Sequence, residues 1–251
     1  MASYRFLTEK ASTPAGRGEI LLSEGLWYSQ KFPPVRLQEP FDWEVNPHDS
    51  RTWVWLYHQL AFSEALFAYD EEDGGRDGRN YYLRALKDWW THHADVGTAP
   101  DYAWHDHGAA KRLESVLKLQ RLSKRSISVE DAACISDIID GHVAFLVDER
   151  NYSQGTNHGL DQSIALYLAA SRAADKPWRE AYAAIAVKRL AAEVCFSFAS
   201  DGGHKENSVQ YHQLGMMQLE KLKTLKKQCA KFPIAQIEGV DTLLTLSLIH
   251  I

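Results

Sequence analysis

The sequence contains no apolar run of the roughly 18 residues that a membrane-spanning helix requires, so we expect no membrane partner. It also lacks long runs of lysine and arginine, and its formal charge is −5. A nucleic-acid partner is therefore not expected, because phosphates demand a concentrated basic surface. Cysteine is scarce: Cys134, Cys195 and Cys229 do not have metal-ligand spacing, and we interpret each as a small apolar residue in a helix.

The two ends of the sequence are unusual in composition. Residues 1–10 lack the apolar core of a secretory signal, so the default expectation is a cytoplasmic protein, and a periplasmic or secreted one if the N-terminus is incomplete. Residues 246–251 form a short apolar tail that resembles a translated adapter more than the end of a domain. We therefore expect a truncated gene product that ends in a non-native tail.

Apolar residues recur at helical spacing from Arg51 onward, and no segment alternates with a period of two. Prolines are concentrated in the first 50 residues, which predicts an irregular N-terminal wrap over 1–50 and a helical domain over 51–245. The fold class is therefore all-α. Antiparallel helix pairs could form a bundle, a solenoid or a toroid, and periodicity does not choose among them. The expected helices cover about 51–69, 80–90, 109–122, 128–148, 158–173, 178–198 and 208–231.

Residues 151–159 form a polar segment directly ahead of a predicted helix. Asn157 and His158 would lie near the positive end of that helix dipole, which is a suitable place to hold a carboxylate. The simpler interpretation is that Thr156 or Asn157 only caps the helix. Both interpretations predict that the helix begins at this point.

A second polar segment, 200–212, lies between the last two predicted helices. Its two glycines permit a tight turn, and Glu206, Tyr211 and His212 then follow at spacings that could converge on one cavity. The simpler interpretation is an Asp-Gly turn followed by a capped helix, with Tyr211 half buried. The two interpretations are compatible, because a capped turn can also carry a site.

A third group consists of Trp104, His105, Asp106 and His107, with Arg112 on the helix that follows. Alternating histidines suggest a metal site, but no further ligand lies at a suitable spacing, so we expect no metal. We favour the wall of a cleft, where the guanidinium of Arg112 would face a carboxylate or support the turn.

Together these segments resemble the heparinase II/III family of polysaccharide lyases, which is related to oligoalginate lyases. The resemblance rests on the N-H-G segment at 157–159 and on the D-G-x-x-x-E-x-S-x-x-Y-H segment at 201–212. The Trp-rich segment from Trp53 to His58 and the run from Trp104 to Leu113 also resemble the family, and the likeness covers about 45–220. Val209 stands where the family often has proline. The resemblance implies an incomplete toroid of antiparallel helix hairpins followed by a β-sandwich. This chain would supply the toroid part and no sandwich, and any structural metal would belong to that absent domain.

The resemblance also implies cleavage of uronic-acid-containing glycans by β-elimination, with no cofactor. Asn157, with His158, would neutralise the uronate carboxylate, and Tyr211 would act as base, acid or both. Glu206 would orient a histidine or the substrate, and His212 would be catalytic or would fix Tyr211 by a hydrogen bond. The partner is therefore an acidic polysaccharide or oligosaccharide.

The expected substrate-binding residues lie earlier in the chain: His105, His107, Arg112, Trp53 and Trp104. Trp53, Trp104 and Tyr102 would form sugar-stacking walls, and ordinary helix packing is the alternative for all three. A glycoside hydrolase is the alternative enzyme, with Asp201 and Glu206 as its two carboxylates. The non-enzymatic alternative is a carbohydrate-binding helical domain.

Overall fold

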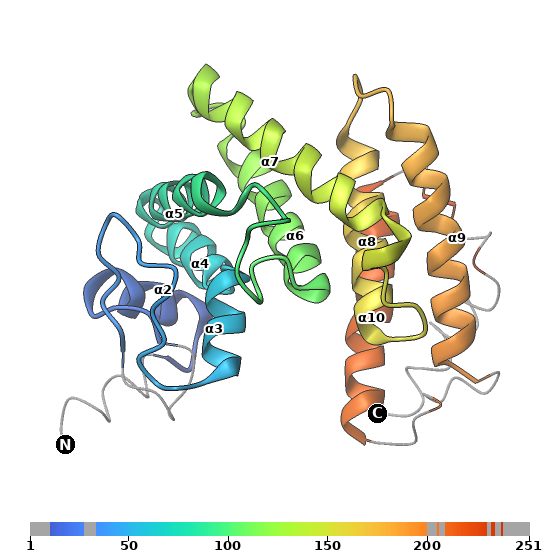
Figure 1. The fold of residues 1–251 in the computed structure, drawn as a ribbon, viewed down its shortest axis with the longest axis horizontal. Helices are drawn as coiled ribbons and strands as arrows, with labels where there is room; N and C mark the ends of the chain where they lie inside the picture. The colour runs from blue at the N-terminus through green and yellow to red at the C-terminus, as the bar shows by residue number, and fades with distance from the viewer. Residues whose placement is uncertain are drawn as a thin grey trace. The chain divides into compact units, whose positions relative to one another are not determined.

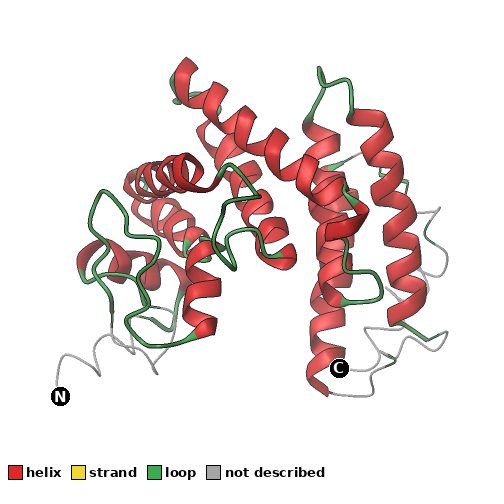
Figure 2. Ribbon diagram, in the orientation of Figure 1, coloured by secondary structure: helices red, strands yellow, loops and turns green. Residues whose placement is uncertain are grey.

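The computed structural model describes residues 11–27, 34–199, 205, 209–229, 232–233 and 237. Within that part every regular element is a helix (Figure 1), and Figure 2 draws no strand there. The prediction of an all-α chain is confirmed. The elements are α2 (Pro14–Ser23), α3 (Arg51–His58), α4 (Ser63–Asp73), α5 (Asp77–His93), α6 (Asp106–Ser123), α7 (Val129–Val147), the short 3-10 helix η1 (Glu149–Asn151), α8 (Asn157–Arg172), α9 (Arg179–Ser197) and α10 (Val209–Gln228).

The chain divides into two compact units. The first consists of Met1–Gly108 with Ser115–Ile139, and the second of Ala109–Glu114 with Asp140–Ile251. Helices α6 and α7 each contribute residues to both units. The boundary predicted at residue 50 lies inside the first unit, where α2 packs with α4.

The first unit is built on close contacts of α4 with α2 and α5. A Cβ atom added to Gly18 of α2 would lie 2.3 Å from the carbonyl oxygen of Ala65, so α2 and α4 approach at a distance that only glycine allows. Asp70, near the end of α4, accepts hydrogen bonds from the amides of Gly78 at 2.8 Å and Arg79 at 2.9 Å. Its carboxylate therefore satisfies two of the unpaired amides at the start of α5.

Two predictions about the first unit were wrong. Residues 14–23 form α2 rather than an irregular path, because Thr13 caps this helix and Pro14 occupies its first turn, where no amide is needed. The single helix expected from Arg51 is divided into α3 and α4. The break falls at Leu60, whose φ of 54° is left-handed and cannot continue a helix.

Helix starts in the rest of the chain follow the sequence signals. The side chain of Ser128 accepts a hydrogen bond from the amide of Asp131 at 3.0 Å, which confirms it as the cap of α7. The second unit contains α8, which is buried along most of its length, with α9 and α10 packed beside it. No helix in the described ranges is long and apolar enough to cross a bilayer.

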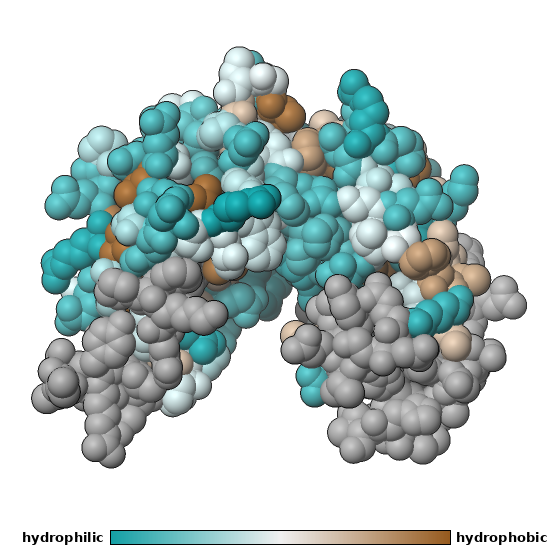
Figure 3. Space-filling view, turned by 60° about the horizontal axis from the view of Figure 1, so that its bottom comes forward, coloured by the Kyte–Doolittle hydropathy of each residue, from teal (hydrophilic) through white to brown (hydrophobic). Residues whose placement is uncertain are grey.

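The coloured part of the face drawn in Figure 3 is predominantly hydrophilic, with apolar residues scattered over it in small groups. Among the described residues, the large apolar side chains that are exposed are Val96, Val129, Phe196 and Met217. They come from four separate parts of the sequence, and single exposed apolar residues of this kind are ordinary on protein surfaces.

Candidate functional site

The N-terminus of α8 is capped as the sequence predicted. The side chain of Thr156 accepts a hydrogen bond from the amide of Gly159 at 3.1 Å and donates one to the carbonyl of Ser153 at 2.7 Å. Asn157 and His158 are then the first two residues of the helix, and both are half buried. They lie in the first turn, where unpaired amides and the helix dipole favour an anion.

Glu193 of α9 anchors the loop that leads into α8. Its side chain is fully buried, and its Oε1 atom accepts hydrogen bonds from the hydroxyl of Tyr152 and from the amide of Gly155, the latter at 3.0 Å. Burial and the hydrogen bond to Glu193 raise the pKa of Tyr152 well above its ordinary value, so this phenol remains a donor at neutral pH. The φ of Gly155 is 71°, a left-handed conformation that suits glycine.

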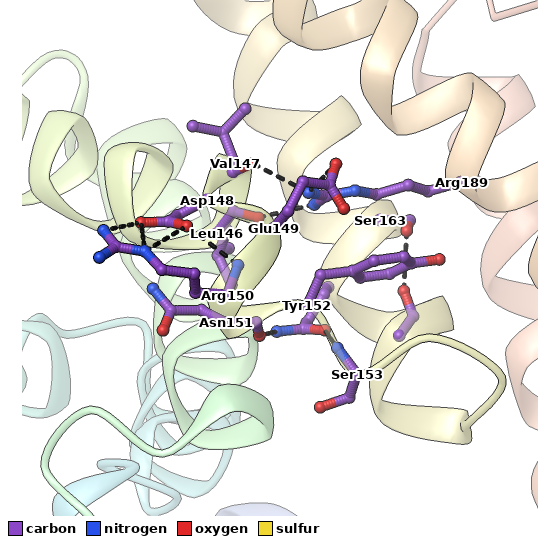
Figure 4. A network of polar contacts seen from close by, with 12 residues as sticks. Leu146, Val147, Asp148, Glu149, Arg150, Asn151, Tyr152, Ser153, Ser163 and Arg189 are labelled. Carbon is purple, nitrogen blue, oxygen red and sulfur yellow. Dashed lines mark hydrogen bonds and ion pairs between the residues drawn. The ribbon is translucent and has the colours of Figure 1, made fainter.

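Arg189, one helical turn before Glu193, holds the start of the same loop. Its guanidinium donates to the carbonyls of Leu146 at 2.7 Å and Val147 at 2.9 Å, which are otherwise unpaired at the end of α7. The guanidinium also lies 4.1 Å from the centre of the Tyr152 ring, within cation–π distance. Figure 4 shows Arg189 reaching from α9 to this segment. Its side chain is 5% exposed, so these contacts are made away from solvent.

Gln162 of α8 also binds the backbone of this loop. Its amide donates to the carbonyl of Asn151 at 2.7 Å, and its oxygen accepts from the amide of Ser153 at 3.0 Å. Asn151 in turn donates from its side chain to the carbonyl of Phe145 at 3.0 Å. The segment before Asn157 is therefore fixed by side chains of both α8 and α9.

Helix α10 runs parallel to α8. Gln218 donates to the carbonyl of Asn157 at 2.8 Å, Lys221 to Asp161 at 2.9 Å, and Cys229 to Ser171 at 3.1 Å, across sequence separations of 61, 60 and 58 residues. Such a steady separation means that the two helices advance in the same direction. Residues of α10 ahead of Gln218 therefore extend past the start of α8.

The backbone of Tyr211 lies in that extension. Tyr211 precedes Gln218 on α10, by about two helical turns. Gln218 itself contacts the backbone of Asn157, so α10 carries Tyr211 toward the level of the loop before α8. The side chains of Tyr211 and His212 lie outside the described residues, as does the whole of Glu206. Their predicted convergence with Asn157 stays a prediction.

Four ionisable side chains join α6, α8 and α10 inside the second unit. Asp161, which is 2% exposed, accepts from Lys111 at 2.7 Å and Lys221 at 2.9 Å, and Lys221 also pairs with Glu114 at 3.2 Å. Burial lowers the pKa of Lys111. Burial also opposes the charge of Lys221, but the carboxylates of Glu114 and Asp161 outweigh it and raise its pKa. We call these four residues the buried ion cluster.

Two of the predicted substrate-binding residues are core residues. The side chain of Arg112 has no exposed surface, and its Nε donates to His142 at 2.8 Å, so it cannot face a substrate carboxylate as it lies. Trp53 is also fully buried, with its ring centre 4.9 Å from that of Tyr57 and 5.9 Å from that of His48. We therefore assign both residues to packing rather than to substrate contact.

Trp104, His105 and His107 are half buried in the first unit. The indole of Trp104 donates to the carbonyl of His93 at 2.7 Å, which fixes the ring. The ring centres of His105 and His107 lie 6.1 and 5.8 Å from that of Trp55.

Sequence reasoning missed two members of the aromatic group around these histidines. Trp55 is half buried, and Arg51 is exposed and donates to the hydroxyl of Tyr102 at 2.7 Å, while the ring of Tyr102 stacks on His105. The sequence Trp53-Val54-Trp55 indicated that the two tryptophans have different environments, because residues two apart on a helix face different sides. With Trp53 inside, Trp55 had to lie on another face. We call Arg51, Trp55, Tyr102, His105 and His107 the aromatic surface group.

Among the described residues, no three histidine, cysteine, aspartate or glutamate side chains are placed to hold a metal ion. At the start of α8 the described residues supply backbone amides, the side chains of Asn157 and His158, and the helix dipole. Such groups can bind and neutralise a carboxylate.

Known proteins resemble this chain both in sequence family and in fold. The sequence of residues 10–249 matches the family described as Heparinase II/III N-terminus. No curated relative matches the chain. Among solved structures, heparinase III is similar with a TM-score of 0.76 and 18% identity over 94% of this chain, and the heparan sulfate lyase HepC from Pedobacter heparinus with a TM-score of 0.72 and 14% identity over 94%.

The chain spans 38% of the length of each of these two proteins, and at such identities the likeness shows the fold alone. It confirms the predicted fold class, the helical toroid part of this architecture.

Proposed function

The chain belongs to the heparinase II/III N-terminal family, and on that premise we propose that it forms the helical catalytic part of a polysaccharide lyase. Its substrate would be a glycan that contains uronic acid. The observation that carries the proposal is the hydrogen bond from Gln218 to the carbonyl of Asn157, because it joins the positive end of α8 to the helix that carries Tyr211.

Elimination of a uronide requires three actions. The C5 proton moves to a base, the C5–H electron pair forms the C4–C5 double bond, and the C4–O bond breaks as the departing oxygen takes up a proton. The C5 proton is only weakly acidic until the neighbouring carboxylate is neutralised, because the developing enolate would otherwise carry two negative charges. A lyase site therefore needs an anion-binding group as well as a group that transfers protons.

Asn157 and His158 are proposed as the anion-binding group. Their place in the first turn of α8 supports this, since the helix dipole and the unpaired amides add to any hydrogen bond that the side chains donate. Half burial also supports it, because a partly dry site strengthens charge–dipole interactions.

Tyr211 is proposed as the base, the acid or both. A phenol with a pKa near 10 ionises little at neutral pH, so positive charge nearby must lower the pKa of Tyr211 for it to act as a base. His158 is the described candidate for that charge, and His212 is the candidate on α10. Glu206 would orient one of these histidines or the substrate.

The aromatic surface group is proposed to contact the sugar chain. Its half-buried rings and the exposed guanidinium of Arg51 are the kinds of surface that stack on sugar rings and pair with acidic substituents. His105 and His107, two of the predicted substrate-binding residues, belong to this group, and Trp104 lies next to them in sequence. Arg112 and Trp53 are left out of it because both are fully buried.

The test is an assay of the 251-residue chain, and of any longer gene product that contains it, against heparan, hyaluronan, alginate and capsular polysaccharides. Ultraviolet absorbance from a new C4–C5 double bond is expected with at least one of them. Reducing ends that appear without this absorbance would indicate hydrolysis instead. Binding without either product would indicate a carbohydrate-binding domain.

A further inference from the structure

Glu193 contacts the chain on both sides of Asn157. On the N-terminal side its Oε1 atom accepts from Tyr152 and Gly155. On the C-terminal side it lies against Gly159, where an added Cβ would be only 2.8 Å from the same oxygen. Asn157 lies midway between Gly155 and Gly159 in the sequence. A single carboxylate on α9 therefore restrains the backbone on both sides of Asn157.

The hydrogen bonds that the Glu193 carboxylate accepts come from the loop before α8. Glu193 is fully buried, and its second oxygen, Oε2, has no hydrogen-bond partner among the residues that the structure describes. Both donors that the structure gives to the carboxylate belong to the loop before α8. Burial of a carboxylate costs free energy that hydrogen bonds must offset, so the side chain is expected to hold these two donors firmly.

Arg189 completes the arrangement from the same face of α9. It lies one turn before Glu193, pairs with the last carbonyls of α7 and packs over the Tyr152 ring. Tyr152 is thus held at its ring by Arg189 and at its hydroxyl by Glu193. These contacts restrain the loop that leads into the first turn of α8.

We propose that Glu193, acting through Tyr152 and Gly155, is a positioning residue that sets the place of Asn157 and His158 for the reaction. This role rests on the lyase function proposed above. Glu193 would not touch the substrate. It would act because a transition state is stabilised only by groups held in the correct place, and displacement by about 1 Å can cost on the order of 100-fold in rate.

The experiment compares Glu193→Ala, which removes the acceptor, with Glu193→Gln, which keeps an oxygen that can accept from Tyr152 and Gly155. On the glycan that the wild-type protein cleaves, Glu193→Ala is expected to lower kcat on the order of 100-fold while KM changes by less than about threefold. Glu193→Gln is expected to restore kcat to within about fivefold of the wild-type value. Tyr152→Phe, which keeps the ring over Arg189 and removes the donor, is expected to fall between them.

Leu166→Ala is the control for lost stability. Leu166 is a fully buried residue of α8 well beyond its first turn, so its truncation destabilises the fold without touching the loop. It is expected to lower the melting temperature and to leave kcat unchanged at a temperature where the variant is folded. This separates a positioning effect from a loss of folded protein.

A second measurement does not depend on activity. Amide hydrogen exchange at Gly155 is expected to quicken in Glu193→Ala, and exchange at α8 residues beyond Gly159 is expected to stay slow. If the wild-type protein cleaves no uronic-acid glycan, the lyase function fails, whatever the exchange data show. If it does cleave one, and folded Glu193→Ala keeps kcat within about threefold, or Glu193→Gln loses as much as the alanine variant, the positioning role is overturned.

Discussion

Substitution of Asp161 by asparagine tests the buried ion cluster. The change keeps the shape of the side chain and removes the charge that faces both Lys111 and Lys221. Of the two carboxylates of the buried ion cluster, only that of Glu114 then remains beside the two ammonium groups. Removal of one partner from a buried ion pair costs about 3–5 kcal/mol, because the other charge stays buried without compensation.

The expected cost lies near the lower end of that range. The side chains of Lys111 and Lys221 are 24% and 32% exposed, so water can recover part of the lost interaction. We expect Asp161→Asn to lower the free energy of unfolding by about 3 kcal/mol, and the melting temperature by about 6–12 °C. Adding Lys111→Met should recover about half of this loss, because the most deeply buried ammonium is then removed.

Urea unfolding measures the change, with similar m values required so that the comparison concerns stability alone. Glu220→Gln is the matched control on α10, since Glu220 pairs with Lys223 on the surface and its loss is expected to cost less than about 1 kcal/mol. If Asp161→Asn costs no more than this control, the buried ion cluster does not stabilise the packing of α8 against α10.

Three further outcomes are expected. Gly159→Ala should destabilise the fold by roughly 1–3 kcal/mol in thermal unfolding, because its Cβ would lie 2.4 Å from the carbonyl oxygen of Ser153, whereas Gly108→Ala, with its nearest atom at 3.6 Å, should not. Trp55→Ala should raise KM for the glycan several-fold with little change in stability, and an unchanged KM would remove Trp55 from the sugar surface. Burial raises the pKa of Tyr57, so its contribution to stability should be constant below about pH 10, where the unfolded tyrosine is also neutral. Above that pH the contribution should fall by up to about 1.4 kcal/mol per pH unit, and an identical alkaline profile for Tyr57→Phe would contradict this.

Local signals in the sequence predicted most of the helices. Thr156 and Ser128 cap helices because a short side chain with an oxygen satisfies amides that lie three residues away, and no distant contact is needed. The break at Leu60 gave no such signal. An apolar residue at helical spacing continues a helix unless tertiary packing favours another conformation, and packing depends on partners far away in the sequence.

The candidate site was predictable where it depended on one segment and not where it depended on several. Asn157 and His158 could be placed at a helix start from their neighbours alone. Glu193 looked like an ordinary charged residue of an amphipathic helix, and its burial follows from partners such as Tyr152, 41 residues earlier. Arg112 and Trp53 failed as substrate contacts for a related reason: a guanidinium or an indole reads the same in sequence whether it lines a cleft or fills a core.

The most direct test of the proposed lyase function is the reaction of Tyr211→Phe with the glycan that the wild-type protein cleaves, followed by ultraviolet absorbance of the unsaturated product, with binding of the same glycan measured in parallel. The account predicts that the variant binds with nearly wild-type affinity and forms no unsaturated product, because the phenol that transfers the proton is gone. A phenylalanine variant that still forms the product at most of the wild-type rate would contradict it.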